Sequence, residues 1–173
     1  MKPTGVTRRI DELGRIVIPK EIRRNLGIRD GENLEIFIDN DNIILHKHSQ
    51  IHNCEDITKK LCDTVTSVID VDIIITDREK IVAVTNKYNE LVNKKINDKL
   101  IELIDNRTML ITNDVDNIVI DNNSINGYLT IVPIISSIDS LGLVVIVSDK
   151  KNDYEKFAKL ISKILSDKID IYW

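Results

Sequence analysis

The segment Leu13–Ile28 reads LGRIVIPKEIRRNLGI, and it decides how the first fifty residues fold. Its β-branched run Ile16–Ile18 favours a strand. The proline that follows ends this strand and suits the first turn of a helix, where its missing N–H is not needed. Lys20–Leu26 then predicts about two helical turns, with Ile22 and Leu26 facing a core at i, i+4 spacing, before a C-capping glycine. The segment therefore predicts a strand, a short helix and a stop.

The flanking sequence predicts further strands on both sides of this segment. Thr7–Ile18 is predicted as a strand region that the turn Asp11–Gly14 interrupts, and Leu34–Ile38 alternates between two faces as a strand does. Asp39–Asn42 favours a turn, after which Ile43–Leu45 forms the second arm of a hairpin. With about a dozen apolar side chains, the unit buries too little surface to be stable alone. We therefore expect it to pair with a second copy.

Positive charge is concentrated in the same part of the chain. The 173 residues carry a formal net charge of −4, yet residues 1–29 hold eight cations and three acids, whereas residues 30–50 and 51–173 carry net charges of −4 and −5. Six of the eight arginines precede residue 30, and only Arg78 and Arg107 follow it. The planar guanidinium binds phosphate and guanine edges in bidentate fashion, so this cluster predicts a local surface that binds a polyanion.

Composition excludes several other classes of protein. Charged residues make up 30% and hydrophobic residues 42% of the sequence, which is typical of a globular chain with one domain or two small ones. No apolar run approaches the roughly 20 residues that span a bilayer, and the N-terminus lacks the apolar stretch of a signal peptide. The two cysteines are too few for a disulfide framework, so we expect a reducing, cytoplasmic setting and no membrane partner.

The residues KPTGVTRRIDELGRIVIPKEIRRNLGIRDGENLEIFID, from Lys2 to Asp39, resemble the AbrB-type swapped-hairpin DNA-binding domain of bacterial transition-state and sporulation regulators. The resemblance continues to about Lys47. It implies that residues 1–50 form a domain in which two chains interleave their hairpins into one small β-barrel, and that this homodimer binds double-stranded DNA. The positions that match the family's DNA-contacting arginines, followed by two expected helpers, are Arg8, Arg15, Arg23 and Arg24, with Lys2 and Arg9.

Structural roles compete for two of these arginines. Arg15 can pair with Asp11 or Glu12, and Arg24 can pair with Glu21 at i, i−3 spacing. Ion pairs at a protein surface contribute only about 0–1 kcal/mol, so we expect them to yield to phosphate. A helix-turn-helix is a poor alternative for this unit, because that motif needs two helices and the sequence predicts a single short one.

Residues 51–173 predict a separate α+β domain of about 120 residues. The run GYLTIVPIISSIDSLGLVVIVS, from Gly127 to Ser148, is similar to the last two strands of GAF domains. We expect the closing helix to bury Phe157, Leu160, Ile161, Ile164 and Leu165. The apolar patterns indicate, in order, a helix at 53–69, strands at 71–77 and 80–84, a helix at 89–110, strands at 117–121, 127–135 and 141–148, and a closing helix at 152–169.

Together the two resemblances imply a sporulation regulator with an AbrB-type head and a GAF-like C-terminal domain. They imply a homotetramer in which helices of the C-terminal domains join two swapped-hairpin dimers. They also imply activation and repression of late sporulation genes in the forespore, and a possible, unidentified small-molecule effector. The effector pocket stays unassigned, because Tyr128 and the loop Ile120–Ile125, which would border it, fit core packing and a solvated loop better.

Patterns for catalysis and metal binding are weak. The acids are scattered and no nucleophile–base motif is present, so we expect neither an enzyme nor a cofactor. Zinc ligands are available at His46, His48, His52 and Cys54, but their spacing matches no standard motif and a solvated linker fits better. Two other functions stay open. AbrB-type heads also occur in antitoxins, whose C-terminal segment is usually short and disordered, and the chain could instead be a small-molecule sensor with weak DNA affinity.

Overall fold

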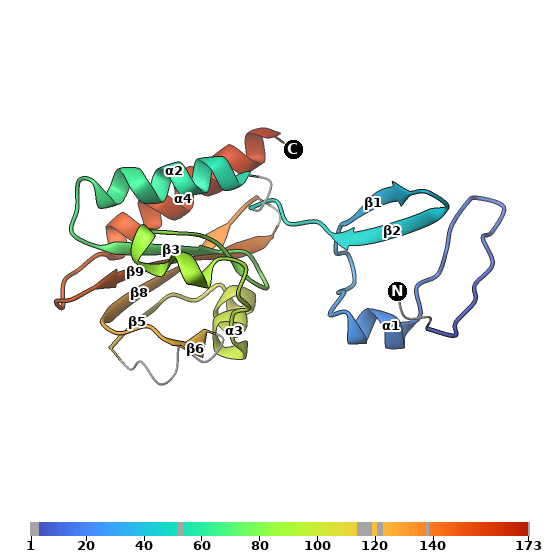
Figure 1. Cartoon of the computed structure of the whole chain (residues 1–173), viewed down its shortest axis with the longest axis horizontal. Coiled ribbons are helices and arrows are strands. Elements are labelled where there is room, and N and C mark those ends of the chain that lie inside the picture. The colour runs from blue at the N-terminus through green and yellow to red at the C-terminus, as the bar shows by residue number, and fades with distance from the viewer. Residues whose placement is uncertain (1–3, 52–53, 114–118, 121–122, 138, 173) are drawn as a thin grey trace. The chain divides into compact units, whose positions relative to one another are not determined.

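The computed structural model describes residues 4–51, 54–113, 119–120, 123–137 and 139–172 of the chain (Figure 1). It divides into two compact units, Met1–His48 and Ser49–Trp173. The smaller unit consists of an N-terminal segment, a short helix and a hairpin, and its arginines precede the hairpin. The larger unit contains a five-stranded sheet with helices on both faces.

The helix of the N-terminal unit is the one that the sequence predicts. It is α1 (Lys20–Asn25), and it begins directly after a proline. Gly27, with a φ of 63°, donates its N–H to the carbonyl of Arg24 at 3.2 Å, and the N–H of Ile28 bonds to the carbonyl of Arg23 at 2.7 Å. This is a glycine C-cap in which two otherwise unpaired helix carbonyls are satisfied, so both the helix and its stop are confirmed.

The predicted hairpin is also confirmed. Strands β1 (Leu34–Asp39) and β2 (Asn42–Lys47) pair antiparallel along their whole length, and Asn40 takes the left-handed conformation at the turn, with a φ of 52°. The strand predicted over Thr7–Ile18 is wrong, because the structure has no strand between residues 4 and 19. A strand needs a hydrogen-bonded neighbour, and the described part of this single unit provides that segment with none beyond its own turn at residues 11–15.

The C-terminal unit is an α+β fold around one antiparallel sheet. The five sheet strands are β3 (Asp72–Thr76), β4 (Ile81–Val84), β5 (Leu110–Thr112), β8 (Tyr128–Ile135) and β9 (Ser140–Ser148). Their order in the sheet is β4-β3-β9-β8-β5, so the sheet confirms the predicted hairpin at 71–84 and the pair at 127–148. A separate small hairpin consists of β6 (Val119–Ile120) and β7 (Asn123–Ser124), while residues 117, 118 and 121 of the strand predicted there lie outside the described residues.

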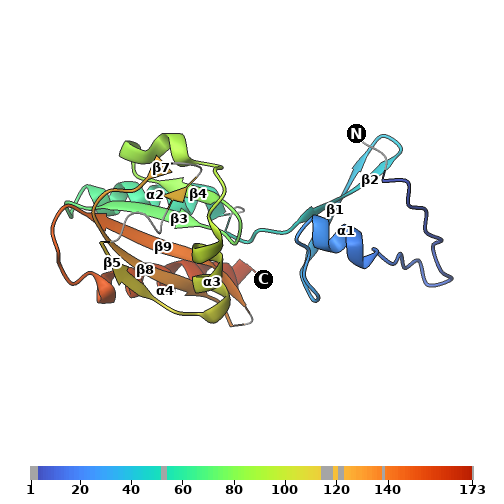
Figure 2. The ribbon, with the colours of Figure 1, turned by 90° about the horizontal axis from the view of Figure 1, so that it is seen from below.

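Helices cover both faces of this sheet (Figure 2). Helices α2 (Glu55–Thr66) and α4 (Glu155–Tyr172) pack over one face, and α3 (Asp98–Asn106) packs over the other, together with the 3₁₀ helix η2 (Asn86–Leu91). Successive strand residues point to opposite faces, so in β3 Ile73 and Ile75 contact the α2–α4 layer while Ile74 faces α3. Two apolar cores result, one on each side of the sheet.

The single helix predicted over 89–110 is wrong. The chain instead forms η2, α3 and then strand β5 in this region, because polar residues divide the apolar pattern. Asn93 has a φ of 66°, which no helix contains, and the side chain of Asn97 accepts the N–H of Leu100 at 3.0 Å and so caps a new helix. Arg107, at a φ of 54°, ends that helix.

The closing helix α4 buries only part of the predicted set. Ile161 and Leu165 are buried, whereas Leu160 and Ile164 remain 55% and 39% exposed, because the chain's own sheet covers one side of the helix only. An apolar stripe is therefore left on the outer side of α4. Among the described residues, no helix is long and apolar enough to cross a membrane.

Candidate nucleic-acid interface

The predicted turn Asp11–Gly14 is built around one carboxylate. The N–H of Asp11 bonds to the carbonyl of Arg15 at 3.1 Å, and the N–H of Gly14, at a φ of 76°, bonds to the carbonyl of Asp11 at 3.0 Å. The Oδ1 of Asp11 also accepts the backbone N–H groups of Leu13 and Arg15, at 3.0 and 2.8 Å. These bonds confirm the turn and hold the pKa of Asp11 below its ordinary value, the backbone N–H of Arg15 contributing most and its guanidinium next.

The same carboxylate holds the side chain of Arg15. Its Oδ2 lies 2.7 Å from Nε of Arg15, which confirms one of the two pairings that the sequence predicts. The arginine side chain is 72% exposed, and the described residues provide no partner for its two terminal nitrogens. Because Asp11 uses only the inner nitrogen, the outer edge of the guanidinium is free to meet a phosphate or a base edge.

Helix α1 carries two further arginines, which differ in exposure and in ion pairing. Arg23 is half-buried and its Nη1 pairs with a carboxylate oxygen of Asp30, whose side chain is 91% exposed. Arg24 is exposed, and its predicted pairing with Glu21 is wrong, since no ion pair joins these two described residues. One arginine of the helix thus has an intramolecular partner, and the other projects into solvent.

The remaining predicted contact residues lie on the N-terminal segment. The Nη1 of Arg8 bonds to the carbonyl of Thr7 at 2.8 Å, and Arg9 is exposed, whereas Lys2 lies outside the described residues. The structure places all five described arginines of the predicted set in the N-terminal unit.

The N-terminal unit leaves its apolar residues in solvent. None of its described side chains is buried, and Leu26, which the sequence predicts to face a core, is 58% exposed. An isolated domain of this size with no core does not pay for the entropy of ordering its chain. Eleven large apolar side chains of the unit are exposed, namely Val6, Ile10, Leu13, Ile16, Val17, Leu26, Ile36, Phe37, Ile38, Ile43 and Leu45.

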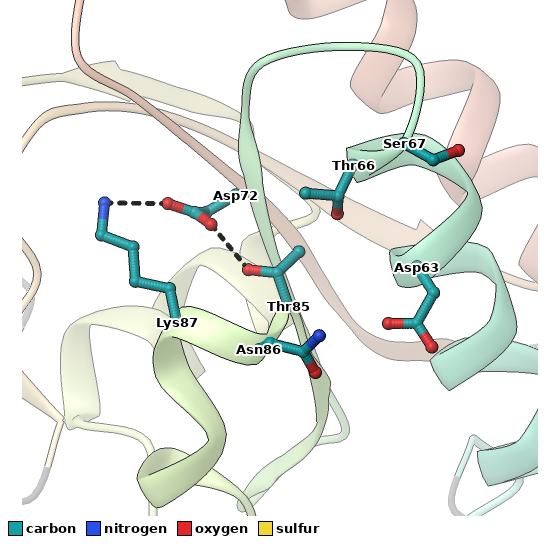
Figure 3. Close-up of a pocket in the computed structure, with 7 residues that line it drawn as sticks. All are labelled: Asp63, Thr66, Ser67, Asp72, Thr85, Asn86 and Lys87. Atoms are coloured by element: carbon teal, nitrogen blue, oxygen red, sulfur yellow. Dashed lines mark hydrogen bonds and ion pairs between the residues drawn. The ribbon is translucent and has the colours of Figure 1, made fainter.

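A polar pocket of about 480 Å³ lies in the C-terminal unit, between the end of α2 and strands β3 and β4 (Figure 3). At its centre, Asp72 accepts a hydrogen bond from the hydroxyl of Thr85 at 2.9 Å and pairs with the ammonium of Lys87 at 3.0 Å. This bond to Asp72 raises the pKa of Lys87. The other lining residues are Asp63, Thr66, Ser67 and Asn86.

The histidines and cysteines do not assemble into a metal site among the described residues. His46 packs edge-on against Phe37, with ring centroids 5.2 Å apart, and Nδ1 of His48 lies 3.6 Å from a carboxylate oxygen of Glu35. His52 lies outside the described residues. Both cysteines are buried, and burial raises the pKa of Cys54 and takes that of Cys62 to about 12, so neither thiol is reactive.

Sequence reasoning missed several residues of these sites. The pairing of Arg15 with Asp11 has a local signal, since four positions separate them, but seven positions separate Arg23 from Asp30 and no spacing rule predicts that contact. The pocket collects side chains from the end of α2, the start of β3 and the start of η2, including Asp72 and Lys87, which only the folded unit brings together. No motif in the sequence could have found it.

Comparison with known proteins covers both units. Residues 53–170 match the family model described as "Stage V sporulation protein T C-terminal, transcription factor", and residues 7–51 match "Antidote-toxin recognition MazE, bacterial antitoxin". The chain is similar to Stage V sporulation protein T of Bacillus subtilis (strain 168), with 40% identity over 153 residues, which cover 86% of this chain and 85% of that protein.

Two further relatives match only part of the chain. The transition state regulatory protein AbrB of the same organism is 36% identical over 95 residues, covering 55% of this chain and 98% of the relative. The solution structure of the N-terminal DNA recognition domain of the Bacillus subtilis regulator AbrB is 56% identical and covers 28% of this chain and 91% of that chain, at a TM-score of 0.24. With an AbrB-like head and a matching C-terminal region of 118 residues, the chain belongs to the stage V sporulation protein T family of transcription factors.

Proposed function

We propose that this protein is a sequence-specific DNA-binding transcription regulator whose N-terminal unit acts as a swapped-hairpin homodimer. The observation that carries the proposal is the combination of exposed apolar faces with an arginine cluster in one unit that has no buried side chain among its described residues. A second copy would cover the apolar faces and leave the charged side chains outside. It would also present every arginine twice, as a two-part DNA site requires.

The proposed DNA surface consists of Arg8, Arg15, Arg23 and Arg24, with Arg9 and Lys2 as helpers. Most contacts would go to phosphates, and a few arginines would read base edges, with the remaining specificity coming from DNA shape. Arg24 and the outer edge of Arg15 are the readiest groups, because described residues leave them unpaired. A regulator of this kind works in the cytoplasm and needs no enzymatic activity, as is usual for the transcription regulators that it resembles.

For the C-terminal unit we propose a GAF-like domain that joins two such dimers into a homotetramer through its helices. The exposed stripe with Leu160 and Ile164 on α4 supports this role, because an apolar stripe on a long helix suits a partner helix. Activation and repression of late sporulation genes in the forespore are proposed from the family alone. The name of the Bacillus subtilis relative supports the link to sporulation.

If a small-molecule effector acts on this chain, the polar pocket beside Asp72 and Lys87 is our candidate site, in place of the region near Tyr128. Its two carboxylates, its single ammonium group and its hydroxyl and amide groups suit a small polar molecule and not an apolar one. An effector changes DNA binding only when it binds one arrangement of the tetramer better than another. An antitoxin role is less well supported, because the long C-terminal unit is folded and has two apolar cores of its own.

The proposal is tested by measuring binding to duplex DNA across a salt series. The variant Arg23→Ala/Arg24→Ala removes two phosphate contacts per chain, or four per dimer, so its salt slope should be shallower by roughly 3 to 4 units, at about 0.9 per contact. The matched control is Lys150→Ala/Lys151→Ala, which removes two exposed positive charges from the C-terminal unit. The control should bind DNA with the wild-type slope.

Both outcomes are informative about the head. A shallower slope in the arginine variant alone, with circular dichroism unchanged, would place the DNA contacts on α1. Weak wild-type binding that both variants leave unchanged would rule out the DNA-binding proposal and direct attention to the C-terminal unit.

A further inference from the structure

An acid lies at the centre of the most basic part of the molecule. We propose that Asp11 is a positioning residue for DNA binding, because its carboxylate fixes the Asp11–Gly14 turn and holds the terminal nitrogens of Arg15 ready for DNA. This inference rests on the proposed function, and it reverses the usual expectation that an acid beside a DNA-binding arginine only weakens binding.

The geometry assigns this role through three bonds from one side chain. Oδ1 of Asp11 accepts the N–H groups of Leu13 and Arg15, and Oδ2 accepts Nε of Arg15. The backbone on both sides of the turn and the guanidinium are thereby tied to the same rigid group. A free arginine side chain loses much rotamer freedom when it binds, whereas an arginine that is already ordered loses less, so its contact with DNA costs less.

The nitrogen that Asp11 contacts determines which edge of the Arg15 guanidinium stays available to DNA. It contacts Nε, which lies on the inner edge of the fork, and the outer edge with both terminal nitrogens stays available to DNA. At Arg23 the arrangement is the opposite, because Asp30 occupies the terminal Nη1, the kind of nitrogen that a phosphate would need. The first acid therefore prepares its arginine for DNA, and the second competes with DNA.

The charge of Asp11 is stable over the conditions in which DNA binds. Its bonds lower the pKa of the carboxyl, so the positioning is fully present above the ordinary carboxylic range and is lost only as the pH falls through the lowered folded value. We therefore expect the contribution of Asp11 to DNA affinity to be constant around neutral pH.

Glu12 provides a matched comparison, because it is the next acid in the same turn. It is exposed, and the described residues form no hydrogen bond or ion pair with its side chain. Neutralising Glu12 should only reduce repulsion of phosphate and so tighten binding slightly. Neutralising Asp11 removes the same charge but also releases Arg15. Charge alone predicts that the two variants behave alike, and positioning predicts changes of opposite sign.

The experiment measures affinity for a labelled duplex DNA of mixed sequence at one fixed salt concentration, with full-length Asp11→Asn, Asp11→Glu and Glu12→Gln. Asp11→Asn should bind roughly three- to tenfold more weakly than the wild type. Asp11→Glu keeps the charge but displaces the carboxylate by one methylene, and it should bind weakly too. Glu12→Gln should bind as tightly as the wild type or somewhat more tightly. Gel filtration and circular dichroism establish that each variant keeps its oligomeric state and fold.

A double-mutant cycle with Arg15→Ala separates positioning from a general structural role. If Asp11 acts through Arg15, Asp11→Asn weakens binding in the wild-type background and has no weakening effect once Arg15 is alanine. Equal weakening in both backgrounds, or tighter binding by Asp11→Asn as for Glu12→Gln, would overturn the proposal. These results differ from failure of the proposed function itself, in which wild-type affinity would be weak and indifferent to Arg15→Ala.

Discussion

The two units of this chain differ in how far they bury their apolar side chains. All thirty buried apolar side chains in the described part of the molecule lie at Ile51 or beyond, whereas eleven of the seventeen exposed large apolar ones lie in the N-terminal unit, which is much the shorter. The C-terminal unit is thus complete as one chain, and the N-terminal unit is not. If the N-terminal unit pairs with a second copy as proposed, its DNA-binding surface and its subunit interface form in the same assembly step.

Arginines show the same contrast. Arg78 of the C-terminal unit bonds through Nη1 to the carbonyl of Ser140 at 2.6 Å and through Nη2 to Asp105 at 2.5 Å, and its side chain is only 24% exposed. Arg15 and Arg24 of the N-terminal unit are exposed and leave nitrogens unused by the described residues. Arg78 therefore stabilises the fold of its own unit, whereas Arg15 and Arg24 have nitrogens available for a ligand.

The largest loss of stability is expected for Gly142→Ala in the C-terminal unit. Gly142 lies in the central strand β9 opposite Ile134, and a Cβ atom there would lie 1.9 Å from the backbone oxygen of Thr76 on β3. Because backbone and not a movable side chain fills this space, we expect a loss of roughly 3 kcal/mol or more in unfolding free energy. Urea unfolding followed by circular dichroism measures it, and an unchanged midpoint would mean that the two strands separate easily.

A charge on each unit's exposed apolar surface tests which surface is covered by a second copy. Ile36 on β1 is 67% exposed and Val68 in the C-terminal unit is 78% exposed, so aspartate at either position should be nearly neutral if both stay in solvent. If the head dimerises, Ile36→Asp buries a charge and should cost roughly 2 kcal/mol per chain. Hydrogen exchange of the β1–β2 amides measures the loss of stability in the N-terminal unit. A nearly neutral effect of Ile36→Asp, like that expected for Val68→Asp, would contradict the dimer.

Much of the C-terminal fold could be predicted, because its strands are long apolar runs with clear turns. The failures have local physical causes. The helix at 89–110 was divided by Asn93, Asn97 and Arg107, whose backbone and capping preferences overrode the apolar periodicity. The burial of Leu160 and Ile164 was overestimated because a helical stripe does not reveal whether its cover comes from the same chain or from a second copy.

The candidate site was less predictable than the fold. The family resemblance indicated the arginines, and spacing indicated the pairing of Arg15 with Asp11. The contact of Arg23 with Asp30 has no such local signal, because seven positions separate the two residues. The strand expected over Thr7–Ile18 failed for a related reason, because a strand depends on a hydrogen-bonded neighbour as much as on its own residues. The segment has the residues of a strand, and the single chain supplies no partner for it among the described residues of the unit.

Alanine at Arg78 and alanine at Arg24 should have opposite effects on stability and on DNA binding. Arg78→Ala should lower the unfolding free energy of the C-terminal unit by about 1–2 kcal/mol, since it removes the hydrogen bonds from the guanidinium to the Ser140 carbonyl and to Asp105. Its DNA affinity should equal that of the wild type. Arg24→Ala should show the reverse, with stability changed by no more than about 0.5 kcal/mol and DNA binding clearly weakened. Parallel denaturation and DNA titrations measure both properties, and a loss of DNA affinity in Arg78→Ala would erase the distinction.

The smallest expected effect concerns the ion pair of Arg23 with Asp30. Because Asp30 is 91% exposed, Asp30→Asn should change stability by only about 0–1 kcal/mol, yet it frees a terminal nitrogen of Arg23. DNA affinity at low salt should then rise roughly two- to fivefold, and the gain should fade as salt screens the released charge. The control is Asp41→Asn, which removes the same charge from the exposed hairpin turn. An identical gain in both variants would show that net charge alone is responsible. A gain specific to Asp30 would mean that its carboxylate occupies the nitrogen of Arg23 that a phosphate binds, and that phosphate can replace it. The contacts of Arg78 could not be replaced in this way, because their loss would destabilise the C-terminal unit.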